Sequence, residues 1–274
     1  MEVCLGVINK MKDQKNVFTE MNGNIKGNEA FQQEGADYSN FSEFKKLVHA
    51  RRSVRKFTEE KIPDDVVEDC LDLGLLAPNS SNLQTWKFYR IVDIEAKKKI
   101  AYACFSQSAA TTAAELIVCV AKPSSWRSHA KQMLDSFARL PVETPKSAIL
   151  YYSKLAPFVY TVGPLNVLTP FKWLLNTTLG FFKVVPREPI SSIGLKLWSV
   201  KSCALACENV MLAFRAAGFD TCPMEGYDSK KVKSILGLDG SESIVMIIGA
   251  GRRAVGGIYG PRIRFDRDQF IKKI

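Results

Sequence analysis

The sequence is poor in the residues that build metal centres. It holds only two histidines, His49 and His129, and an odd number of cysteines, seven, scattered mostly through apolar segments. Structural zinc sites need four such ligands close together. Cys203 and Cys207 are one helical turn apart, and we interpret them as core cysteines. We therefore expect no metal, no disulfide framework, and a reducing, cytoplasmic compartment.

The chain also lacks a long unbroken apolar run. Residues 1–6 have neither the charged start nor the apolar stretch of a secretion signal. Residues 155–182 are almost uncharged, but a membrane span needs about 20 continuous apolar residues. This stretch is interrupted by Pro157, Gly163, Pro164 and Pro170. We therefore expect no transmembrane helix.

What the chain does have is positive charge and enough apolar residues for a core. Its 38 Lys and Arg against 28 Asp and Glu give a net charge of +10, and 46% of its residues are hydrophobic. One or two globular domains are expected at this length of 274 residues. The charge favours an anionic guest, whether a nucleotide phosphate, a nucleic acid or a lipid headgroup. Its sign alone does not choose among them.

The hydrophobic pattern predicts an α+β domain behind a polar arm. Residues 1–40 are mixed and weakly periodic, so we interpret them as an extended or partly disordered arm, and residues 41–274 as the domain. Within the domain, helices are predicted from residue 41, over 64–77, after 93, over 195–217 and after 228, and strands over 86–92, 116–121 and 243–249. An apolar, proline-containing insertion at about 123–194 interrupts this series of predicted helices and strands.

Two polar clusters stand out near the start of the domain. Arg51, Arg52, Ser53 and Arg55 place several guanidinium groups where they can converge on one doubly charged oxyanion such as a phosphate monoester. By itself, such a cluster is more often a solvated surface. The loop at 78–85 carries amide and hydroxyl groups that can bind a heteroaromatic ring edge or a polyol.

Taken together, the two clusters resemble a known family. Arg-Arg-Ser-x-Arg-x-Phe at 51–57, followed by Ala-Pro-x-x-x-Asn-x-Gln-x-Trp at 77–86, resembles the opening of the nitroreductase family of FMN-dependent oxidoreductases. Residues 218–226 resemble a second signature, Gly-x-x-x-x-Pro-x-Glu-Gly, in a turn. Thr85 stands where the family usually has proline, and Asn79 where serine is frequent. The resemblance covers roughly 41–122 and 195–268.

The resemblance implies a fold and an assembly. The fold is three-layered, α-β-α, with a central, mainly antiparallel sheet flanked by helices. Two chains entwine as a homodimer, and they pack on the helix at 195–217. Each cofactor site is then completed by the second subunit.

It also implies a site divided by the parts of FMN, with no catalytic side chain because the flavin carries the chemistry. The phosphate is held by Arg51, Arg262 and Arg264. The phosphate, ribityl and pyrimidine side is lined by Arg52, Ser53 and Arg55, with Arg55 stabilising the anionic reduced flavin. The other subunit contributes Pro78, Asn79, Ser80 and Asn82. Gln107 touches the pyrimidine edge. The turn over the ring contains Pro223, Met224, Glu225 and Gly226, with a backbone N–H near Glu225 facing the flavin N5.

The resulting hypothesis is an oxidoreductase that moves hydride from NADH or NADPH through FMN to a nitroaromatic, quinone, enone or similar small acceptor. Nucleic acid is not an expected partner, since the lysines at 97–99 are typical of a solvated face. Two alternatives stay open. One is a basic, non-enzymatic binding module for membrane or nucleic acid, and the other is a same-fold flavin enzyme such as a dehalogenase or a flavin-fragmenting enzyme.

The insertion is interpreted first as a lid or a dimer-covering element. A membrane-surface contact through residues 155–182 is the second option. Its aromatic residues are flanked by basic ones: Trp173, Phe181 and Phe182 by Lys154, Lys172, Lys183 and Arg187.

Overall fold

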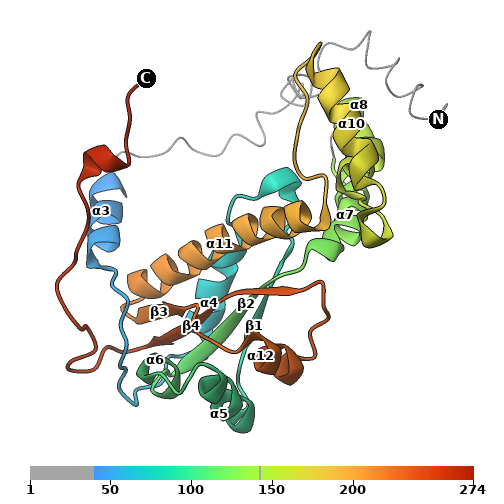
Figure 1. The fold of residues 1–274 in the computed structure, drawn as a ribbon. Helices are drawn as coiled ribbons and strands as arrows, with labels where there is room; N and C mark the ends of the chain where they lie inside the picture. Colours follow the sequence, from blue (N-terminus) through green and yellow to red (C-terminus); the bar gives the residue numbers. More distant parts are fainter. Residues whose placement is uncertain (1–39, 142) are drawn as a thin grey trace.

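The computed structural model describes residues 40–141 and 143–274 (Figure 1). The predicted arm at 1–40 lies almost wholly outside these residues. At the centre is a four-stranded antiparallel sheet in the order β1-β2-β4-β3. The strands are β1 (Trp86–Arg90), β2 (Glu115–Ala121), β3 (Asp220–Met224) and β4 (Ser243–Gly251). The predicted antiparallel sheet is confirmed.

Helices cover both faces of this sheet. One face carries α4 (Asp64–Leu75) and α11 (Ser192–Ala216), and the other carries α5 (Ile94–Ala103), α6 (Ser108–Thr111) and α12 (Ser229–Leu236) (Figure 1). Side chains alternate across a strand. Accordingly, residues 117, 119 and 121 of β2 join the core under α4 and α11, and residues 116, 118 and 120 join the core under α5, α6 and α12. The layers are therefore α-β-α, as expected.

Local signals set the helix boundaries. The Asp228 carboxylate accepts from the backbone N–H groups of Lys230 (3.0 Å) and Lys231 (3.2 Å), which starts α12. The helix ends at Gly237 in the left-handed conformation, at φ 63°. The long helix α11 buries Cys203 and Cys207 completely. Their predicted place in the core is confirmed.

The insertion is helical, which the sequence pattern did not predict. It contains α7 (Trp126–Phe137), α8 (Lys146–Leu150), the π-helical turn η4 (Tyr151–Leu155), α9 (Ala156–Tyr160) and α10 (Thr169–Gly180). These helices share a small aromatic core with the start of α11, in which Tyr160 stacks on Trp198 at 4.5 Å between ring centroids. Pro157 and Pro170, which interrupt the apolar run that a membrane span would need, stand in the first turns of α9 and α10, where the missing N–H costs nothing.

The remaining elements are short or peripheral. They are α3 (Asn40–Ala50), η2 (Ser80–Asn82), η3 (Pro123–Ser125), η5 (Pro164–Asn166) and η6 (Arg267–Gln269). None of the helices in the described part of the chain is both long and apolar enough to cross a bilayer.

Lys172 in α10 is an unusual buried cation. Its side chain is only 5% exposed, and its Nζ donates to the backbone oxygen of Val159 at 2.8 Å. Burial removes water from the ammonium group and lowers the pKa of Lys172 to about 8.

Replacing Lys172 by methionine is expected to remove a pH dependence of stability. The ordinary pKa of 10.5 applies to the unfolded chain, and the folded protein has a pKa of about 8. The unfolded chain therefore binds more protons between these values, and the free energy of unfolding rises with pH across that window. The cost of the buried charge is fully present below pH 8 and is relieved as pH rises towards 10.5. From neutral pH to the top of the window, wild type should gain about 2 to 3 kcal/mol relative to Lys172→Met. Urea unfolding of both proteins at several pH values measures this difference. The prediction would be contradicted if the free energies of unfolding of the two proteins changed in parallel with pH.

Candidate functional site

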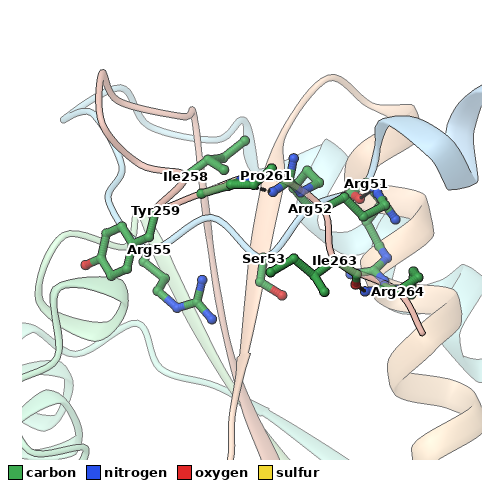
Figure 2. Close-up of a pocket in the computed structure, with 11 residues that line it drawn as sticks. Arg51, Arg52, Ser53, Arg55, Ile258, Tyr259, Pro261, Ile263 and Arg264 are labelled. Atoms are coloured by element: carbon green, nitrogen blue, oxygen red, sulfur yellow. Dashed lines mark hydrogen bonds between the residues drawn. The ribbon is translucent and has the colours of Figure 1, made fainter.

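Two segments about two hundred residues apart in sequence are tied together at one edge of the sheet. Residues 51–55, which follow α3, lie against the segment 257–264, which follows β4 (Figure 2). The backbone N–H of Arg55 donates to the Gly257 oxygen at 2.7 Å, and that of Val54 donates to the Thr221 oxygen at 3.0 Å. The segment 51–55 is thus anchored to the segment 257–264, which follows β4, and to β3.

Side chains reinforce this junction. Arg262 Nη2 donates to the backbone oxygens of His49 at 2.9 Å and Arg51 at 2.5 Å. Arg52 Nη2 donates to the Gly260 oxygen at 2.6 Å. Each segment therefore holds the backbone of the other through a guanidinium group.

Gly257 allows the close approach on which the junction depends. A Cβ at this position would stand 2.6 Å from the Lys56 oxygen and 3.0 Å from the Ala254 oxygen. Both atoms are backbone, so neither can turn aside. A side chain here would push the two segments apart.

Between the segments lies a cavity of about 240 Å³. Five of its lining residues are arginines and none is acidic; the lining is Arg51, Arg52, Ser53, Arg55, Ile258, Tyr259, Gly260, Pro261, Arg262, Ile263 and Arg264. All six residues that the sequence assigned to the phosphate and ribityl side are therefore brought together (Figure 2).

The charges in this cavity are poorly compensated. Loss of water around Arg262 and the positive charges of neighbouring arginines 264, 52 and 51 lower the pKa of Arg262. Among the described residues, the buried Arg51 Nε has no hydrogen-bond partner, and its one ion pair is a long contact of 3.7 Å to the half-exposed Glu208 carboxylate. An unsatisfied guanidinium N–H among like charges is a site for an anion. The residues present fit a phosphate group.

The other end of the cavity is aromatic. The Arg55 guanidinium lies over the Tyr259 ring, 5.3 Å from its centroid, and Figure 2 shows this pair apart from Arg51 and Arg264. The sequence did not single out Tyr259, Ile258, Pro261 or Ile263. The available signal was their position beside Arg262 and Arg264 in one short segment, whose residues 258–264 all line the cavity.

Gln107 and Gly226 lie next to each other. Gln107 Nε2 donates to the Gly226 oxygen at 2.8 Å and to the Cys104 oxygen at 2.9 Å. The amide is therefore fixed with its nitrogen turned towards the protein, which leaves Oε1 as an acceptor. This pairing was not predicted, although both residues were assigned to the ring.

The local structure predicted around Pro223 was wrong. Pro223 and Met224 belong to β3 and pair with Ile248 and Ile247, so the turn begins only at Glu225. Proline is tolerated there because β3 is an edge strand, where a missing N–H breaks no second ladder.

The loop at 78–82 lies elsewhere in the same chain. None of its residues lines the arginine cavity. Instead, Ser81 is hydrogen-bonded to the hydroxyls of Tyr151 and Tyr160, and the Tyr152 hydroxyl donates to the Ser81 oxygen at 2.8 Å. Ser81 and Asn82 adopt positive φ angles of 59° and 47°. The insertion thus holds this loop in an unusual conformation.

Within the loop, Asn79 has a clear structural task. Its Oδ1 accepts from the backbone N–H of Gln84 at 2.8 Å, and its Nδ2 donates to the Ala77 oxygen at 3.3 Å. Thr85, which stands in place of the expected proline, is buried, and its hydroxyl has no hydrogen-bond partner among the residues that the structure describes. Its backbone oxygen accepts from Ser199 Oγ at 2.9 Å.

Comparison with known proteins gives consistent results. The family model described as Nitroreductase family matches residues 48–252. Bacillus subtilis YdgI, which carries the name NAD(P)H nitroreductase, is 28% identical over 82% of this chain and 95% of its own. The solved structure of Bacillus subtilis ydfN, named a nitroreductase, gives a TM-score of 0.68 at 22% identity over 85% of this chain and 100% of that one. The structure of a nitroreductase of Exiguobacterium sibiricum, solved in complex with FMN, gives a TM-score of 0.60. It is 21% identical in sequence, and the match covers 88% of this chain and 99% of that one.

Proposed function

The chain belongs to the nitroreductase family, and from this we propose that it is an FMN-dependent oxidoreductase that takes hydride from NADH or NADPH and passes it to a small organic acceptor. The observation that carries the proposal is the cavity with five arginines and no acid, which suits the phosphate monoester at the end of FMN. The FMN in the Exiguobacterium sibiricum structure supports the cofactor, and the name of YdgI supports the reductant.

Each part of this cavity has a task in the proposal. Arg51, Arg262 and Arg264 would hold the phosphate, and Arg52 and Ser53 would line the ribityl chain. Arg55, kept in place by the Tyr259 ring, would put positive charge beside the pyrimidine side of the flavin. When bound, FMN supplies the hydride chemistry itself. The chain's residues bind, orient and shield the ring.

The ring side of the site would be built by Gln107 and by the turn that starts at Glu225. The hydrogen bond from Gln107 to Gly226 fixes the spacing between these two segments. Such rigidity matters because hydride transfer depends on the orientation of the reacting groups. A backbone N–H near Glu225 would face the flavin N5.

A homodimer completes this proposal. Drug-sized ligands occupy cavities of about 300 to 1,000 Å³, so the cavity of about 240 Å³ suits only part of FMN. In one chain, α3 buries no residue, with Phe44 at 52% exposure and Val48 at 39%. Leu197 and Leu205 of α11 are both half exposed. A second copy would cover these apolar faces and bring its 78–82 loop to the ring.

The acceptor is proposed only as a class: a nitroaromatic, a quinone or an enone. These compounds accept hydride and differ in the pocket that orients them, and the 78–82 loop and the insertion are the segments that would form it. The rival hypothesis, a basic binding module without enzymatic activity, needs no flavin.

Purified protein separates the two hypotheses. The proposed enzyme is yellow or takes up added FMN, is bleached anaerobically by NADH or NADPH, and regains its colour on addition of a member of an acceptor panel. A colourless protein that does not bind added FMN would contradict the proposal. Bleaching without reoxidation by any acceptor would leave the cofactor assigned and remove the acceptor classes.

Mixed dimers test whether one site uses two chains. One variant carries Arg51→Ala and Arg264→Ala, the other Asn79→Ala and Asn82→Ala, and each alone is expected to be nearly inactive. In a heterodimer one site has both sets of changes and the other has neither. Heterodimers purified through two different tags should therefore regain about half of the wild-type activity. Recovery no greater than the mean of the two parents would place both groups in one chain's site.

A further inference from the structure

Helix α10 has its polarity inverted relative to a helix on a water-facing surface. Its one charged side chain, Lys172, is 5% exposed, while Phe171, Trp173 and Leu174 are 53%, 58% and 58% exposed. A surface helix normally turns its apolar stripe towards the core and its charges outwards. Here the apolar stripe faces away from the protein.

The exposed apolar surface continues on both sides of this helix. Leu165 and Val167 precede α10 and are 101% and 64% exposed. Phe181, Phe182 and Val184 follow it at 80%, 83% and 104%. We call these five residues, with Phe171, Trp173 and Leu174, the α10 surface. Such a cluster is unusual on a water-exposed protein and marks an interaction site.

The charge around the α10 surface is predominantly positive, with Glu143 and Glu188 only at the two ends of the stretch. Residues 144–187 include no aspartate or glutamate, but they include Lys146, Lys154, Lys172, Lys183 and Arg187. All except Lys172 are exposed. An apolar centre with a basic rim is the composition of segments that lie at the surface of an anionic bilayer.

Lys172 is the one charge that would oppose insertion of α10 into lipid, and the fold turns it inwards. Its Nζ donates to the Val159 oxygen at 2.8 Å and lies 5.7 Å from the centre of the Phe158 ring. The helix can therefore enter the headgroup region with no charge on its outward face.

We propose that the α10 surface attaches this protein peripherally to a bilayer that contains anionic lipid. Trp173, Phe181 and Phe182 would enter the boundary between headgroups and acyl chains, and Lys154, Lys183 and Arg187 would contact the headgroup phosphates. The attachment is peripheral because no helix of the described residues could span a membrane.

The charge distribution favours lipid over a second copy of the chain. In a two-fold contact the same patch meets itself, so the exposed Lys146, Lys154, Lys183 and Arg187 would face one another, with only Glu143 and Glu188 at the two ends of the stretch to offset their charge. In Figure 1 the insertion lies at the N-terminal end of α11, and α3 lies towards the other end. The part of the proposed dimer contact that α3 provides is therefore remote from the α10 surface, and the lipid proposal does not depend on the flavin chemistry.

Tryptophan fluorescence provides a direct probe. Of the four tryptophans, Trp86, Trp126 and Trp198 are at most 7% exposed, whereas Trp173 is 58% exposed. Vesicles of phosphatidylglycerol mixed with phosphatidylcholine should shift the emission to shorter wavelength and carry the full-length protein into the pellet. Trp173→Phe should still sediment with these vesicles but lose the shift. A shift that persists in Trp173→Phe would contradict the assigned contact.

Paired variants test the apolar and basic parts separately. The double variant Phe181→Ser, Phe182→Ser should reduce vesicle binding by about tenfold or more. Lys154→Glu with Lys183→Glu should weaken binding to anionic vesicles, and added salt should weaken binding of wild type in the same way. The matched control is Val92→Ser with Tyr102→Ser, two residues 73% and 66% exposed on other elements, which should bind like wild type. Unchanged urea midpoints establish that each variant is folded.

Four results would overturn the proposal. The first is absence of sedimentation with anionic vesicles. The second is equal binding of wild type to pure phosphatidylcholine. The third is wild-type binding by the Phe181→Ser, Phe182→Ser protein. The fourth is concentration-dependent assembly beyond a dimer, without lipid, that this double variant abolishes, because it would assign the α10 surface to a second copy.

Discussion

A protein carrying both Arg51→Ala and Arg264→Ala is expected to be purified without flavin and to bind added FMN about 100-fold more weakly than wild type, or worse. Both guanidinium groups line the acid-free cavity. Among the described residues, Arg51 Nε has no hydrogen-bond partner, and its ion pair with Glu208 spans 3.7 Å. The Glu208 side chain is half exposed, so water can solvate its carboxylate once Arg51 is removed. Within residues 40–141 and 143–274, the Arg264 side chain donates only to the neighbouring Ile263 oxygen, at 2.8 Å. Neither change removes a hydrogen bond that joins the two segments.

Arg262 is a poorer choice for this experiment. Its guanidinium donates to the backbone oxygens of His49 and Arg51, so Arg262→Ala would loosen the cavity as well as remove a charge. The pair Arg139→Ala and Arg267→Ala removes the same charge from exposed positions outside the cavity and serves as the control.

Fluorescence titration with FMN at several salt concentrations measures the effect. Wild-type affinity should fall as salt rises, and the double variant should show a shallower dependence, because fewer charges meet the phosphate. If the double variant binds FMN as well as wild type does, the arginine cavity is not the phosphate site.

Asp220→Ala is expected to destabilise the protein by about 3 to 4 kcal/mol. The carboxylate is at the start of β3 and is 4% exposed. It accepts from Arg215 Nη1 at 3.0 Å and from Arg253 Nη2 and Nε at 2.8 and 3.1 Å. Its removal would leave two partly buried guanidinium groups facing each other without a counter-charge.

The same substitution should weaken cofactor binding, although Asp220 is not in the cavity. Arg253 pairs with Phe57 across an isolated bridge, and Thr221 pairs with Ser53. Asp220 therefore holds two contacts of the segment that carries Arg51 and Arg55.

Urea unfolding, with FMN affinity measured on the folded fraction, tests both effects. Asp72→Ala, at an exposed position in α4, is the matched control and should change stability by less than about 0.5 kcal/mol. If Asp220→Ala lowers the free energy of unfolding no more than the control does, water solvates Arg215 and Arg253 well enough to replace the carboxylate.

The pattern of this sequence was sufficient for most elements of its core, but not for β3, which contributes Cys222 and Met224 and was predicted as a turn. The apolar run of β2 and the spacing in α11 predict their burial, and Asp228 and Gly237 mark the two ends of α12. These features depend on neighbours within one or two turns. The arginine cluster and the loop at 78–82 were found through the resemblance, since either cluster alone would suit a solvated surface.

Only the tertiary structure decided how those groups lie in space. It placed Tyr259 under Arg55, joined Gln107 to Gly226, and tied Ser81 to tyrosines of the insertion about 70 to 80 positions away. It also turned Lys172 inwards, although the sequence suggested a flanking surface charge. Such contacts join segments far apart in the chain, and their energies depend on packing and on exclusion of water, which no local spacing of residues encodes.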